Sequence, residues 1–70
     1  MDAQQLTTAL ASEDPGLQLR AVLALRRLAE QVEAAGVVAA RRHGWSWQQV
    51  GDALGVTRQA AHTKHGKDTP

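Results

Sequence analysis

The apolar positions of residues 45–65 follow helical spacing in two short runs that a glycine separates. Val50, Ala53 and Leu54 place one narrow apolar stripe on the first run. Gly55 follows at once, and a glycine ends a helix where a left-handed backbone conformation costs least. The pattern therefore predicts one short helix that stops at Gly55 and a second that begins almost immediately after it.

The start of the first helix carries two capping signals. Ser46 is a good N-cap residue, and Gln49 three positions later completes a capping box that satisfies backbone donors at the helix start. Trp45 before the cap and Val50 inside the helix are spaced to form a hydrophobic staple. These signals predict a helix that begins directly after Ser46.

The connection between the two helices is too short for them to run antiparallel. Thr57 starts the second helix, and only Val56 stands between it and Gly55. We expect Val56 to be a buried plug and the two helices to cross at a steep angle. This is the shape of a helix-turn-helix DNA reader.

The second helix presents polar side chains near its N-terminus. Arg58 and Gln59 have forked donors and acceptors that match the edges of guanine and adenine in the major groove. Ala60 and Ala61 are small enough for close approach to a neighbouring helix or a DNA backbone. Any solvated helix carries such polar residues, but here the pair directly follows a capped turn, which favours base recognition.

The run Trp-Ser-Trp-Gln-Gln-Val-Gly-Asp-Ala-Leu-Gly-Val-Thr-Arg-Gln-Ala-Ala-His resembles the homeodomain-like helix-turn-helix proteins of high-GC bacteria. It is also similar, more distantly, to the final helix-turn-helix of primary sigma factors. The resemblance covers roughly residues 41–65, and it is specific for the fold rather than for a target sequence. It implies that Gly51 is the small residue at the helix crossing.

The resemblance also implies which residues pack and which face DNA. The implied core positions are Val50, Leu54, Val56 and Ala61. Ala61 stands where a larger Val or Ile is common, and His65 where an aromatic ring often closes the core, so both predict a thinner core. The predicted DNA-binding residues are Thr57, Arg58, Gln59, His62, Thr63, Lys64, nearer the backbone, and Ser46.

Two more helices are predicted upstream. Asp2 and Gln5 cap a first one, which residues 12–16 break. Asp14 is the N-cap of a second, long helix that runs to His43 and is roughly 40 Å long if unbroken. The apolar face of the first helix holds Ala3, Leu6, Ala9 and Leu10.

The long helix has apolar residues on two sides. One stripe includes Leu19, Val22 and Leu23, and the other steps by four and three, the spacing of a helix seam. We expect the second stripe to meet another copy of the chain, because a small domain cannot cover both. The alternative is a broad buried face in a compact four-helix monomer. The predicted dimer interface contains Leu25, Leu28, Val32, Ala21 and Ala35.

Composition and charge set limits on these predictions. Seventy residues make one small all-α domain. Residues 1–43 are predicted to form a helical region for dimerisation and support, residues 45–65 form the helix-turn-helix, and residues 66–70 are a polar tail too short to fold. The net charge is only +1, but the bases gather in the second half, with Arg41, Arg42, Arg58, Lys64 and Lys67 against Asp52 and Asp68. We expect weak, salt-sensitive phosphate contact by a single chain.

The sequence lacks the signatures of catalysis, cofactors, metals and membrane spans. No Cys accompanies His43, His62 and His65, and the expected role of the last two is contact with DNA or solvent. No glycine-rich phosphate loop follows a strand, and no stretch has the length of apolar residues that a membrane span requires. The N-terminus also lacks a basic signal-peptide head, so we expect a cytoplasmic protein. Because the signatures of catalysis are missing, we expect that it is not an enzyme.

Two functions of different class fit the sequence. The first is a dimeric bacterial transcriptional regulator that reads double-stranded DNA, a role that also implies RNA polymerase or another regulator as a partner. The second is a protein-interaction module, an adaptor or anti-regulator that keeps the helix-turn-helix fold without DNA contact. The low net charge and the apolar seam favour the second, and the Arg58-Gln59 pair at a helix start favours the first.

Overall fold

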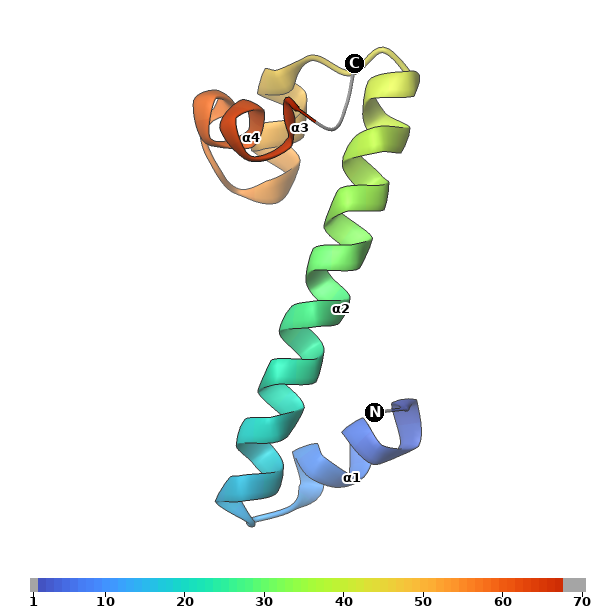
Figure 1. The fold of residues 1–70 in the computed structure, drawn as a ribbon, viewed down its shortest axis with the longest axis vertical. Coiled ribbons are helices and arrows are strands. Elements are labelled where there is room, and N and C mark those ends of the chain that lie inside the picture. The colour runs from blue at the N-terminus through green and yellow to red at the C-terminus, as the bar shows by residue number, and fades with distance from the viewer. Residues whose placement is uncertain (1, 68–70) are drawn as a thin grey trace. The chain divides into compact units, whose positions relative to one another are not determined.

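A computed structural model describes residues 2–67, which form four α-helices and no strand (Figure 1). The prediction of an all-α chain is confirmed. The helices are α1 (Ala3–Ala11), α2 (Pro15–Arg42), α3 (Trp47–Leu54) and α4 (Arg58–His65). The chain divides into two compact units, residues 1–31 and residues 32–70, and the division falls inside α2. The last residues of the predicted tail, 68–70, lie outside the described residues.

In the N-terminal unit, the helix starts are where the sequence predicts them. The backbone N–H of Gln5 donates to the Asp2 carboxylate at 2.8 Å, and the Gln5 side-chain oxygen accepts from the Asp2 N–H at 2.9 Å. The carboxylate of Asp14 accepts from the N–H groups of Gly16 and Leu17 at 2.9 and 3.3 Å. Both predicted caps are confirmed.

The N-terminal unit buries very little. Of its described residues, only Ala9 and Ala21 are buried, and the large apolar side chains of Leu10, Leu19 and Leu23 are exposed. Ala9 and Ala21 line one small hollow between α1 and α2. Ala21, which the sequence analysis assigned to a dimer interface, is only 2% exposed in the single chain.

The end of α2 is a glycine-terminated turn. The helix ends at Arg42, one residue before the predicted end, and Gly44 adopts a φ of 83°. The N–H of Gly44 donates to the Arg41 carbonyl at 3.1 Å, and the N–H of Trp45 donates to the Ala40 carbonyl at 3.0 Å. This pair of bonds is a Schellman motif, which satisfies carbonyl groups that the helix leaves unpaired.

The end of α3 repeats this motif. Gly55 has a φ of 73°, its N–H donates to the Asp52 carbonyl at 3.3 Å, and the N–H of Val56 donates to the Gly51 carbonyl at 2.9 Å. The predicted stop at Gly55 is confirmed. Because the chain leaves the motif at once, α4 begins after a connection of only three residues and packs against α3.

The core of the C-terminal unit is small, as predicted. Val37, Val50 and Ala61 are buried together, with Ala40 and Trp47 partly buried beside them. The close approach that the sequence predicts at Gly51 is confirmed. A Cβ at this position would lie 2.9 Å from the carbonyl oxygen of Val56, so α3 requires glycine at residue 51.

Two predicted core positions are wrong. Val56 is 45% exposed, and Leu54 is also exposed. The reason lies in the turn: the backbone carbonyl of Val56, not its side chain, fills the space beside Gly51. Leu54 belongs instead to the wall of an open hollow between α2 and α3.

Candidate nucleic-acid interface

The N-terminus of α4 is capped by one side chain, that of Thr57. Thr57 has an extended backbone conformation, and its Oγ1 accepts a hydrogen bond from the N–H of Ala60 at 3.0 Å. The cap fixes the first turn of α4, on which Arg58 and Gln59 follow directly. Both side chains are exposed. The two predicted base readers are thus held on an ordered helical turn that is open to solvent.

One open hollow brings together four of the predicted DNA-binding residues. Its walls come from the start of α3 and the first turns of α4, and the hollow is lined by Trp47, Gln48, Thr57, Arg58, Gln59 and His62. Trp47 and Gln48 are the two members that the sequence analysis did not assign to the site. The Gln48 amide donates to Asp52 at 2.9 Å, which orients this side chain along α3.

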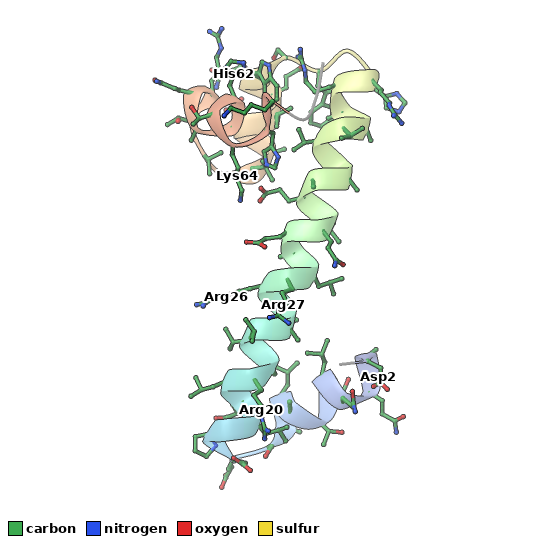
Figure 2. All side chains as sticks on the ribbon, viewed as in Figure 1. Asp2, Arg20, Arg26, Arg27, His62 and Lys64 are labelled. Carbon is green, nitrogen blue, oxygen red and sulfur yellow. The ribbon has the colours of Figure 1, made fainter. Side chains whose placement is uncertain are left out.

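The remaining predicted residues lie apart from this hollow. Ser46 is the N-cap of α3, where its Oγ accepts from the N–H of Gln49 at 3.1 Å. Thr63 is exposed but is not part of the hollow. Lys64 extends its ammonium group to within 2.8 Å of the Glu33 carboxylate on α2. Figure 2 shows His62 and Lys64 on different sides of α4.

His65 does not have the expected role of contacting DNA or solvent. It is only 7% exposed, and its Nε2 lies 2.7 Å from Oε2 of Glu33. Hydrogen bonds from Lys64 and then from His65 lower the pKa of Glu33 below its ordinary value of 4.5. The three side chains tie the end of α4 to α2. His65 is therefore buried at the end of α4, and its ring nitrogen is satisfied by Glu33.

A second group of contacts that the sequence analysis missed centres on Trp47. The guanidinium carbon of Arg41 lies 4.7 Å from the centre of the Trp47 ring, and the Arg41 Nη1 donates to the Trp45 carbonyl at 2.6 Å. The Trp47 and His62 rings meet edge to face, with centres 5.1 Å apart and planes inclined by 66°. Residues from α2, α3 and α4 thus converge at one side of the hollow.

The C-terminal unit has a further, apolar hollow between α2 and α3. Trp45 and Val50 both line it, which places the two residues of the predicted staple at one site. Trp45 remains partly exposed there. The lining consists mostly of small or branched apolar side chains: Val32, Gly36, Val37, Ala39, Ala40, Ala53 and Leu54, with Glu33 and His43.

Nowhere in residues 2–67 do three or more His, Asp or Glu side chains gather in a way that could hold a metal ion. None of the helices in the same range is long and apolar enough to cross a membrane. Comparisons with protein-family models, with curated proteins and with solved structures found no match to this chain.

Proposed function

We propose that this chain is a small sequence-specific DNA-binding protein, a bacterial transcriptional regulator whose helix-turn-helix consists of α3 and α4. The observation that carries the proposal is the hollow in which Thr57, Arg58, Gln59 and His62 gather at the capped start of α4. Arginine pairs with guanine and glutamine with adenine through two hydrogen bonds each in the major groove. An exposed, rigid helix start that carries both is suited to that groove.

The charges around the hollow predict how strongly one chain binds. Arg58 lines the hollow and Arg41 lies beside Trp47, whereas Asp52 is held near by Gln48. Few phosphates can be neutralised by so few cations, so the affinity of one chain is low and falls as salt rises. Two copies that bind neighbouring half-sites would compensate for this weakness.

A homodimer is the second part of the proposal. Three of the interface residues predicted on α2 are open in the single chain: Leu25 is 39% exposed, Leu28 is 49% exposed and Val32 is 64% exposed. Ala35 is also exposed. Burying side chains of this kind in a symmetric contact is favourable by the hydrophobic effect. Ala21 is not part of this surface.

A protein-interaction module is the second candidate function. It is favoured by the exposed leucines of the N-terminal unit and by the apolar hollow that Trp45 and Leu54 border. In that case the partner of the chain is another protein, and the side chains of the α4 hollow have no base to read.

Selection from random double-stranded DNA distinguishes the two functions. We expect the unsubstituted protein to enrich one sequence, with affinity that falls between low and moderate salt. Arg58→Ala and Gln59→Ala should each weaken binding to the enriched site by about 1 to 3 kcal/mol and relax the preference at one base pair.

A matched control for these two variants is Arg26→Ala, which removes the same charge from an exposed position on α2. It should leave the base preference unchanged. No enrichment of any sequence, or unchanged preference in both Arg58→Ala and Gln59→Ala, would favour the interaction module.

A further inference from the structure

We propose that Trp47 is a positioning residue that holds the His62 ring ready to contact a base edge of double-stranded DNA. This inference rests on the proposed DNA-binding function. Trp47 is the first residue of α3, directly after the Ser46 cap, and it is half-buried beside the core of the C-terminal unit. The helix therefore fixes the backbone of Trp47, and the core fixes its indole ring.

The His62 ring is exposed to solvent but has a wall on two sides. One wall is the Trp47 ring, which it meets edge to face at 5.1 Å. The other is the backbone at Gly66, where a Cβ would lie 2.9 Å from Cδ2 and 3.0 Å from Nε2 of His62. Between these walls the imidazole has less freedom than an ordinary surface side chain, so less entropy is lost when it binds.

Arg41 holds Trp47 from α2. Its guanidinium lies over the indole at 4.7 Å, and its hydrogen bond to the Trp45 carbonyl fixes it at the entrance to α3. The cation also meets the face of the ring, where the electron density of an aromatic system attracts positive charge. The contacts run from α2 through Trp47 to α4, so the orientation of His62 depends on residues outside the helix that carries it.

The position of His62 on α4 indicates what it contacts. His62 lies four residues after Arg58, so both side chains project from one face of the helix, and both line the same hollow. An imidazole edge can donate or accept one hydrogen bond at a base edge. A helix whose Arg58 contacts one base pair therefore brings His62 to a neighbouring base pair.

A double-mutant cycle on the intact chain tests this inference. The variants are Trp47→Leu, His62→Ala, the double variant and Trp47→Phe, each titrated by fluorescence anisotropy against the duplex selected by the unsubstituted protein. Loss of one base contact corresponds to about tenfold weaker binding. We expect about this loss in both single variants, no further loss in the double variant, and recovery of most of the affinity in Trp47→Phe.

A readout in the free protein separates positioning from general damage. In an NMR spectrum without DNA, the Trp47 ring should displace the ring-proton signals of His62 from the positions of a solvated histidine. Trp47→Leu should remove that displacement, whereas Trp45→Leu, in the other hollow, should not. If Trp47→Leu does not fold, Trp47→Phe serves as the second variant, because the smaller phenyl ring should displace the His62 signals by a smaller amount than the indole does; an unchanged displacement would contradict the contact.

The possible outcomes separate the two proposals. If the unsubstituted protein selects no duplex, the proposed function and this inference both fail. If it does select a duplex but the losses in Trp47→Leu and His62→Ala simply add, the positioning role of Trp47 alone is overturned. His62 signals at the solvated position in the unsubstituted protein overturn it as well.

Discussion

The two units of this chain use the same signals to form helices but differ in what those helices pack against. Residues 2–31 contain a capping box and an Asp N-cap, yet most of the large apolar side chains that they carry stay exposed. Residues 32–67 also have caps and add two Schellman turns, a buried apolar cluster and the Glu33 contacts with α4. Capping starts a helix wherever it occurs, but only the second unit brings its helices together around a core.

The two units differ in the size of the side chains at their helix contacts. In the C-terminal unit, Gly51 and Ala61 are small, so α3 and α4 approach closely and one valine from each of α2 and α3 is enough to fill the space. Among the described residues of the N-terminal unit, only Ala9 and Ala21 are buried, and they line one hollow. The larger residues beside that pair remain available for a contact outside the chain.

The largest expected effect comes from a substitution that removes the proposed contact with a second copy of the chain. Leu28→Glu would place two like charges in or near the proposed two-fold interface. It would also forfeit about 1.5 to 3 kcal/mol of leucine burial per dimer, because Leu28 is 49% exposed in the single chain. Sedimentation at micromolar concentration should show the unsubstituted protein near twice its 7.5 kDa and the variant near one chain mass. Leu19→Glu, on the opposite helix face, is the control and should stay dimeric. A single-chain mass for the unsubstituted protein would contradict the dimer.

A pair of glycine substitutions tests the role of close approach. Gly51→Ala should cost about 2 kcal/mol, because its methyl group would meet the Val56 carbonyl and force α3 and α4 apart. Gly36→Ala introduces the same methyl group inside α2, where nothing lies within 4 Å, and should stabilise the chain by about 0.5 to 1 kcal/mol. Urea denaturation measures both changes. Equal effects of the same sign would mean that helix propensity, not helix contact, dominates.

The parts of the fold that were predicted from the sequence depend on neighbouring residues. Ser46, Gly55 and Asp14 act on backbone groups within four positions, so their types and spacing were enough to place the helix ends. Thr57 and the side chains that follow it were predicted to form a site for the same local reason. The close approach at Gly51 was implied by the resemblance to helix-turn-helix proteins rather than by the local pattern of residues.

The parts that were missed depend on residues far apart in the chain. His65 and Glu33 are 32 positions apart, and nothing in either local pattern indicates that they meet. Trp47 contacts Arg41 and His62 on two other helices, an arrangement that follows only after α3 and α4 pack. A buried position held by a histidine was the one available signal, because a buried imidazole requires a polar partner.

Removing a cap from each unit compares their dependence on tertiary packing. Ser46→Ala should cost about 1 kcal/mol and lower the melting temperature by several degrees, because α3 carries core residues and the chain is small. Asp2→Ala removes the equivalent cap from α1, which contributes little to burial. It should fray α1, seen as a small loss of helical circular dichroism, with little change in melting temperature. A similar drop for both variants would show that the N-terminal unit unfolds together with the C-terminal one.

The smallest expected effect concerns acid stability, and it is confined to the second unit. Because the pKa of Glu33 is lowered in the folded chain, its ionised form contributes stability that is complete above its ordinary value of 4.5 and is lost as the pH falls through the lower, folded value. Glu33→Gln should therefore melt at a lower temperature than the unsubstituted protein at neutral pH, and the gap should close in strong acid. The effect is modest because Glu33 is 25% exposed and Lys64 is 59% exposed, so solvent screens the pair. Glu30→Gln, one turn earlier on α2, removes the same charge from an exposed position and is the control. A gap for Glu33→Gln that persists unchanged below the folded pKa would mean that Glu33 acts through packing rather than through its charge.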